Sequence, residues 1–291
     1  MKLPLLALAL LPLLPLTACQ STGTRGGDYV VYDTASGEPE ELSALCERLA
    51  EFDVVFLGEE HDNDAGHRLQ LWTLARLAEL RPNLVLSMEQ FEADVQGQLD
   101  LYLQDAISEE EFLSSSRPWG NYAEHYRPLV EFAKARGYPV VAANIPRPLA
   151  SRVSRGGVHV LGGNRLSPWL VWLEEPEYME RFAKAMGRNE VDPEDVGLAR
   201  WFAAQCVKDE KMAESIAETL AAAGSDRPLV VHVCGKFHSD YHLGTVSRLQ
   251  RRKPQLAIAV ISMKSDDRLS RSLSEEERTR GESLWLVRPQ P

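Results

Sequence analysis

The chain has 291 residues, of which 26% are charged and 44% are hydrophobic, and its formal net charge is −11. No block of basic residues interrupts this acidic balance, so the composition argues against nucleic acid as a partner and against a surface that adheres to anionic lipid by charge. The length fits one domain of ordinary size.

Residues 1–18 are typical of a secretory signal. Lys2 is followed by an apolar run, interrupted only by prolines, that is too short to span a bilayer as a helix. The run ends in Leu16-Thr17-Ala18-Cys19, which resembles the bacterial lipoprotein processing signal. We expect residues 1–18 to be removed and Cys19 to carry lipid, so that the chain is anchored to a membrane without being embedded in it. The alternative is an ordinary signal peptide with an incidental cysteine.

Residues 19–28 are polar and rich in glycine, and we expect them to form a flexible tether to a globular body at residues 29–291. Three cysteines remain in that body. Cys46 and Cys206 fall on amphipathic helical patterns, where a buried thiol is the ordinary expectation, and Cys234 makes the number odd. The sequence therefore predicts no disulfide framework.

Strand and helix patterns alternate from Tyr29 to the end of the chain, which is typical of an α/β fold. We expect a mainly parallel central sheet with helices on both faces. The stretch His61–Leu80 has helical periodicity and stops before Arg81-Pro82. The predicted strands are Tyr29–Tyr32, Asp53–Leu57, Leu84–Met88, Pro139–Ala143, Pro228–Val233, Leu256–Ser262 and Leu284–Val287.

Two segments depart from strict alternation. Residues 91–127 hold only helical patterns, with a capping box at Ser108 and Glu111, and we predict a small all-helical insertion there. A second helical block runs from 175 to 223, with Gly224 as its expected C-cap. The glycine-rich stretch before it, residues 156–164, is expected to form a loop.

The same pattern, Gly-x-x-His, follows two of the predicted strands, at Gly58–His61 and Gly235–His238, and a third strand ends in Glu89. Loops that leave the carboxyl ends of parallel strands converge on one crevice, so we expect His61, Glu89 and His238 to meet there. Each glycine would let the backbone turn sharply and aim its histidine into the crevice. Two histidines and a glutamate form a familiar ligand set for divalent metals. The alternative is that the motifs are unrelated surface loops.

Four neighbouring residues are candidates for a supporting role. Of the adjacent residues Glu59 and Glu60, we expect one side chain to face the crevice and the other to face solvent. His242 lies four residues after His238 on an expected helix, so both could face one ion, and His67 lies six residues after His61. A supporting or packing role is the favoured interpretation for His67 and His242.

Other polar residues have ordinary interpretations. Asp209 and Glu210 lie on a helix with a core-facing apolar stripe, and we expect both acids to be solvated. Lys236 is expected to face solvent. The remaining histidines, which have no spacing partner, are expected to be structural: His125, His159 and His232.

As a set, several segments resemble the ChaN family of haem-binding uptake lipoproteins in the Tiki superfamily. They are the lipobox, Gly58–Asn63 with His67, Met88-Glu89-Gln90, Ala142–Arg147, Asp209-x-x-Met212-Ala213 and Gly235-x-x-His238. Proteases and erythromycin-esterase-like relatives in the superfamily share the paired Gly-x-x-His motifs and a glutamate as their proposed active site. The resemblance implies a parallel sheet flanked by helices, a small all-helical domain, and a role in bacterial haem or iron acquisition.

The resemblance also implies a mode of haem binding. Haem would lie between two copies of the chain, with a tyrosine on its iron, at the periplasmic face of an outer membrane that holds a haem uptake system. Tyr126 and Tyr122 are the candidate ligands, because they share one helical face with Trp119. A plain aromatic core stripe is the competing interpretation.

Residue chemistry alone favours a different hypothesis, a metal-dependent esterase or peptidase. His61, Glu89 and His238 would hold a divalent ion, and Glu59 or Glu60 would act as the general base. The lipoprotein architecture matches the haem-binding branch of the superfamily. We therefore take haem binding as the main hypothesis and keep the hydrolase as the alternative.

Overall fold

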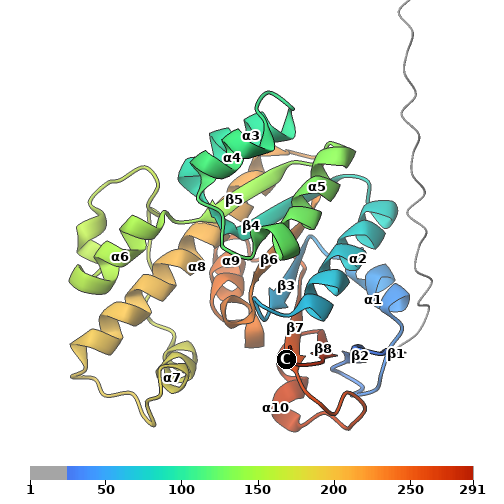
Figure 1. Cartoon of the computed structure of the whole chain (residues 1–291). Coiled ribbons are helices and arrows are strands. Elements are labelled where there is room, and N and C mark those ends of the chain that lie inside the picture. The colour runs from blue at the N-terminus through green and yellow to red at the C-terminus, as the bar shows by residue number, and fades with distance from the viewer. Residues whose placement is uncertain (1–24, 291) are drawn as a thin grey trace, which may run out of the picture.

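A computed structural model of the chain describes residues 25–290, so the expected signal peptide and Cys19 lie outside the described residues. An eight-stranded sheet forms its centre, in the order β1-β2-β8-β7-β3-β6-β4-β5 (Figure 1). The strands are β1 (Arg25–Gly26), β2 (Tyr29–Asp33), β3 (Val54–Glu59), β4 (Leu84–Glu92), β5 (Val140–Asn144), β6 (Leu229–Gly235), β7 (Ile258–Ser265) and β8 (Ser283–Val287).

The six strands from β8 to β5 in this order run parallel, whereas β2 pairs antiparallel with β8 and β1 antiparallel with β2. This arrangement confirms the predicted α/β fold, and each of the predicted strands forms. The short strand β1 was not predicted. It overlaps the expected tether at residues 25–26, where backbone pairing with Tyr29 and Val30 orders the chain.

Helices cover both faces of the sheet because side chains of the central strands alternate between two cores. In β3, Val55 and Leu57 face the core under α1 to α5, while Val54 and Phe56 face the core under α8 and α9. The helices are α1 (Leu42–Leu49), α2 (Asp64–Leu80), α3 (Gln96–Leu103), α4 (Glu109–Ser116), α5 (Arg127–Arg136), α6 (Arg147–Gly156), α7 (Pro176–Ala185), α8 (Val196–Ala222), α9 (Thr245–Arg252) and α10 (Glu275–Arg278).

The predicted insertion is helical, but it starts later than expected and has no core of its own. Strand β4 runs on to Glu92 past an irregularity in its pairing with β5, and the helices begin only at Ala93. The predicted capping box at Ser108 and Glu111 is present at the start of α4. Side chains of α3, α4 and the π-helical turn Tyr122–Tyr126 join the same buried cluster as the sheet. The insertion is therefore a cap on one face of the sheet.

A helical lobe made of α6, α7 and the first half of α8 projects beside the sheet, at the left of Figure 1. Its two small apolar clusters pack on α8 rather than on the sheet. The stretch expected to be a loop, residues 156–164, contains a short 3-10 helix at Val158–Leu161. Gly224 follows α8 with a φ of 63°, as a residue just past a helix end commonly does.

Within residues 25–290 there is no helix with both the length and the apolar character needed to cross a bilayer.

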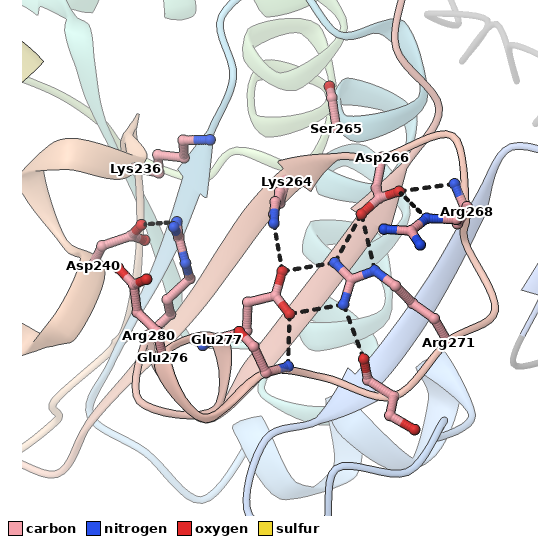
Figure 2. A network of polar contacts seen from close by, with 12 residues as sticks. Lys236, Asp240, Lys264, Ser265, Asp266, Arg268, Arg271, Glu276, Glu277 and Arg280 are labelled. Carbon is pink, nitrogen blue, oxygen red and sulfur yellow. Dashed lines mark hydrogen bonds and ion pairs between the residues drawn. The ribbon is translucent and has the colours of Figure 1, made fainter.

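The C-terminal segment between β7 and β8 is held by a dense ionic network (Figure 2). Glu277 accepts hydrogen bonds from Arg271 at 2.6 and 2.7 Å and pairs with Lys264 at 2.5 Å. Asp266 also pairs with Arg271, at 2.8 Å. A few residues on, Arg280 donates to Asp240 at 2.7 Å and so ties this segment to the loop after β6.

Candidate functional site

The structure brings His61, Glu89 and His238 together on one cavity of about 500 Å³. His61 follows β3, Glu89 lies in β4 and His238 follows β6, and these strands are neighbours in the sheet. Their carboxyl ends therefore meet at one edge, as the topology of a parallel sheet requires. The cavity lies between this edge and the helical lobe, with residues from both among its walls.

The two motif glycines serve close packing rather than a sharp turn. Gly235 has an ordinary φ of −55°, and Gly58 is not among the residues with positive φ. A Cβ on Gly235 would lie 2.8 Å from Cε1 of His61, and one on Gly58 would lie 2.7 Å from Oγ of Ser239. Each glycine thus leaves room for a residue of a neighbouring loop. The prediction that the glycines are needed for a sharp backbone turn is therefore wrong.

His238 is buried between two carboxylates. Its Nδ1 lies 2.6 Å from Oδ1 of Asp209, and its Nε2 lies 3.2 Å from Oε1 of Glu89. Burial alone would lower the pKa of His238, but the charges of Glu89 and Asp209 raise it to about 10. Burial likewise opposes the charged form of Glu89, yet His238 and the Gly235 N–H hold its pKa well below the usual range. At neutral pH the site therefore contains an imidazolium between two carboxylates.

Asp209 is not solvated, contrary to the sequence-based expectation. Its side chain is fully buried on α8 and accepts hydrogen bonds from Tyr178 and Thr245 at 2.8 and 2.9 Å. Glu210 is buried as well and pairs with Arg252 at 2.6 Å. A signal for Asp209 was present in the sequence, because it falls at helical spacing between members of the predicted apolar stripe, which is Val196, Ala199, Phe202, Cys206, Ile216 and Leu220.

His61 is oriented by Glu59, which is the buried member of the Glu59-Glu60 pair. Oε1 of Glu59 lies 2.8 Å from Nδ1 of His61 and accepts from the Tyr126 hydroxyl at 2.6 Å. Gln70 and Gln90 donate to the same carboxylate at 2.7 and 3.0 Å. Burial lowers the pKa of His61, but Glu59 and Glu89 outweigh it and the pKa is raised.

Glu60 lies outside this site and is half-buried rather than free in solvent. It forms an ion pair with Lys236, which is also half-buried instead of solvent-facing as expected. The backbone N–H of Ser265 donates to Glu60 at 3.2 Å. Burial raises the pKa of Glu60, but the Lys236 and Ser265 hydrogen bonds bring it below the usual value. This pair links β3 to the loop after β6.

Of the two supporting histidines, His67 adjoins the site and His242 does not. Nε2 of His67 lies 3.1 Å from the carbonyl oxygen of His61, and its ring stacks on His125 at 4.1 Å. The helix expected after His238 is interrupted, since Tyr241 and His242 have φ values of 63° and 57°. His242 turns away to Glu282, with Nε2 and Oε1 3.3 Å apart.

The geometry gives the metal-dependent hydrolase hypothesis no support. Among residues 25–290, no three His, Cys, Asp or Glu side chains are arranged to hold a metal ion. Glu89 and His238 are already paired with each other, and Asp209 occupies the other nitrogen of His238. What the arrangement offers instead is proton transfer and anion binding, because a carboxylate-oriented His61 faces the same cavity as a protonated His238.

Neither tyrosine suggested as a haem ligand is open to a ligand in this structure. The Tyr126 side chain is fully buried with its hydroxyl on Glu59, and burial next to that carboxylate raises its pKa far above the ordinary range. Tyr122 is buried against Phe91 and Phe112. This is the aromatic core stripe that was the competing interpretation. Of the three aromatic residues Trp119, Tyr122 and Tyr126, it is Trp119 that lines the main cavity, with its ring 5.0 Å from that of His61.

A different tyrosine, which the sequence analysis missed, lines a second cavity of about 300 Å³ beside the first. Tyr241 donates to Glu276 at 2.9 Å, and the Arg181 guanidinium lies 3.3 Å from the centre of its ring. Phe237 and Ala185 line both cavities and separate them. The loop that carries Tyr241 is held by the Asp240–Arg280 pair that is drawn in Figure 2.

Comparisons with known proteins point to one family. The family model described as haem-binding uptake, Tiki superfamily, ChaN matches residues 45–249. A solved structure that describes cofacial haem binding to ChaN of Campylobacter jejuni is 17% identical, with a TM-score of 0.67, and the match covers 90% of this chain and 98% of that one. The type III effector HopBA1 is 12% identical, with a TM-score of 0.51, over 86% of this chain and 94% of its own. No curated protein sequence matches the chain significantly.

Proposed function

Because the chain belongs to the ChaN family of haem-binding uptake proteins in the Tiki superfamily, we propose that it binds haem in the cell envelope. The family match over residues 45–249 carries this proposal, and it includes the main cavity and the part of the second cavity that α7 and the loop after β6 form. The fold shared with ChaN of Campylobacter jejuni, for which cofacial haem binding is described, supports it.

We place the haem iron at Tyr241 rather than at Tyr122 or Tyr126. Tyrosine oxygen is one of the axial ligands that proteins use for haem iron. Tyr241 is half-buried on the wall of a cavity, whereas the two earlier candidates are closed inside the core. Phe237 and Leu243 give this cavity apolar surface for a porphyrin.

The backbone around Tyr241 supports a binding role. Tyr241 and His242 are consecutive non-glycine residues in the left-handed region, with φ values of 63° and 57°. Such conformations cost about 1–3 kcal/mol each and persist where the surrounding structure holds them, often at ligand sites. Here the Tyr241 N–H donates to the Arg280 carbonyl at 2.8 Å, which fixes the strained turn.

Cationic side chains around this cavity suit the two propionates of haem. Arg181, Lys184, Lys236 and Arg280 line it. Arg181, Lys236 and Arg280 are engaged with acidic partners, but Lys184 is exposed and forms no ion pair with another residue in 25–290. Lys184 is therefore the cation most available for a propionate.

Hemin titration followed by absorbance tests the proposal. We expect the purified protein to shift the Soret band, and Tyr241→Phe to weaken binding by about tenfold or more and change the spectrum, because it removes the ligand oxygen. Tyr138→Phe is the matched control. Tyr138 is also half-buried, but it lies beside Phe132, about 100 residues before Tyr241 in the sequence, and lines neither cavity. Loss of the spectrum in Tyr126→Phe, with Tyr241→Phe unaffected, would overturn the assignment to Tyr241, and absence of any Soret shift would overturn haem binding.

We also propose that Cys19 is lipidated and anchors the chain at the periplasmic face of the outer membrane, where it serves a haem uptake system. The lipobox Leu16–Cys19 supports this proposal, and the other cysteines, Cys46, Cys206 and Cys234, are buried and closed to acylation. Labelling with radioactive palmitate tests it. The expected result is label in the wild-type chain and none in Cys19→Ser, with release of that variant from the membrane fraction. Label retained by Cys19→Ser would contradict the proposal.

A further inference from the structure

The cavity that holds His61, Glu89 and His238 also holds two cationic side chains to which the sheet-edge site gives no role. Arg147 is the first residue of α6, and Lys208 lies on α8, so they reach the cavity from different helices of the lobe. Neither forms a hydrogen bond or ion pair with another side chain in residues 25–290. By contrast, Arg152 and Arg155 on the same helix α6 both have hydrogen-bond acceptors.

The acidic side chains on the cavity wall are paired, whereas two cationic ones are not. Its two acidic residues are already paired, Glu89 with His238 at 3.2 Å and Glu92 with Arg117 at 2.9 Å. Arg147 and Lys208 line the same cavity and form no ion pair with a carboxylate in residues 25–290. Two cationic side chains without ion-pair partners on one wall of a cavity attract an anion to that wall.

Much of the remaining wall is apolar, although Asn144 and Gln205 also line it. Ile145, Ala150 and Phe182 are buried side chains with edges on the cavity, and Phe237 and Trp119 are half-buried against it. The volume of about 500 Å³ lies within the range of about 300–1,000 Å³ that is usual for small-molecule sites. An inorganic anion would leave these apolar walls uncovered, whereas an organic anion would bury them.

We propose that this cavity binds a small organic carboxylate with an apolar body, at a site separate from the haem site. Arg147 and Lys208 would hold the carboxylate, Arg147 with its planar two-pronged group, and Phe182, Phe237 and Ile145 would pack on the apolar part. The site goes beyond haem binding, because the cavity at Tyr241 shares only Phe237 and Ala185 with it.

Calorimetric titration of the full chain with benzoate, in the absence of hemin, tests this inference. We expect benzoate to bind, and benzamide and inorganic phosphate to bind at least about tenfold more weakly, since the first lacks the charge and the second the apolar body. Arg147→Gln and Lys208→Gln should each weaken benzoate about tenfold or more. Arg155→Gln, which removes a cation from the same helix outside the cavity, should leave binding unchanged.

The haem and carboxylate proposals can fail separately. Tyr241→Phe should keep benzoate binding, and Arg147→Gln and Lys208→Gln should keep hemin binding. The inference is overturned if benzoate does not bind, if benzamide or phosphate binds as tightly, or if Arg155→Gln loses as much affinity as Arg147→Gln. It is also overturned if Arg147→Gln and Lys208→Gln weaken hemin instead of benzoate. Because the two cations come from different helices, either variant supplies the test should the other fold poorly.

Discussion

The most unusual side chain in the molecule is His238, an imidazole that is almost fully buried and yet favoured in its charged form. Burial by itself would lower the pKa of His238 and favour the neutral ring. The two flanking carboxylates raise the pKa by more than burial lowers it. The pairing makes His238 a fixed positive charge at physiological pH rather than a pH-dependent switch. That role differs from the metal ligand that the sequence pattern suggested.

Asp209→Asn is expected to lower the pKa of His238 by about 1 unit or more, because it removes one of two opposite charges next to the ring. Imidazole resonances followed by NMR through a pH titration measure this change. Glu210→Gln is the matched control, since it removes a buried carboxylate from the next position on α8 without contact to His238. An unchanged pKa in Asp209→Asn would contradict the assignment of Asp209 as a partner.

The sign of the effect on stability follows from the same pKa. The pKa of His238 is about 10 in the folded chain against an ordinary value of 6.5, so the folded state binds the proton more tightly. The resulting contribution to the free energy of unfolding is fully present below pH 6.5 and is lost as the pH rises toward 10. In Asp209→Asn this contribution should be smaller, and its loss should still begin near pH 6.5 but be complete at a lower pH, because only the folded-state pKa falls.

At the scale of elements, the site depends on how closely the loops after β3 and β6 pack. Gly58→Ala is expected to destabilise the chain by about 1–3 kcal/mol, because the added Cβ would lie 3.0 Å from Cα of Lys236 and 3.1 Å from the Ile261 carbonyl oxygen, which are backbone atoms that cannot rotate away. Gly97→Ala in α3 meets nothing within 4 Å and should stabilise the chain by about 0.5–1 kcal/mol. Urea unfolding of both variants measures the contrast. Equal stability of the two variants would show that the loops yield at Gly58.

The strands were predictable because each is a short apolar run that ends in a turn or a polar residue, and parallel topology then dictated that His61, Glu89 and His238 meet. Two parts of the site were not predictable from local pattern. Asp209 comes from a helix more than a hundred residues after the first motif, and only its position within an apolar stripe marked it as buried. Tyr241 follows His238 in a segment that reads as helix, but it lies in a strained turn fixed by the Arg280 carbonyl far along the chain.

At the scale of the whole molecule, the carboxyl edge of the sheet carries two adjoining cavities under the helical lobe. Both use residues of α7 and of the loop after β6, and Phe237 lies between them. The lobe packs mainly on α8 instead of on the sheet. Ligands in either cavity therefore contact some of the same elements, so binding at one can alter affinity at the other through Phe237, α7 or this loop.

The size of the Tyr241 cavity leads to an expectation about assembly. At about 300 Å³ it is at the small end for a ligand site, so a flat porphyrin held at Tyr241 would leave apolar surface outside. A second copy of the chain can cover that surface, and we expect hemin to promote a dimer. Each copy carries a formal net charge of −11, so repulsion between copies opposes this association at low salt.

Sedimentation velocity with saturating hemin should therefore show a dimer that becomes more stable between about 10 mM and 150 mM salt, as the screening length falls from about 30 to about 8 Å. Without hemin, or with Tyr241→Phe, the dimer should be weaker at every salt concentration. A dimer that loosens as salt rises would mean that attractive ion pairs across the interface, and not apolar contact around haem, hold the copies together. A hemin-saturated chain that stays monomeric throughout would mean that one copy encloses its ligand alone.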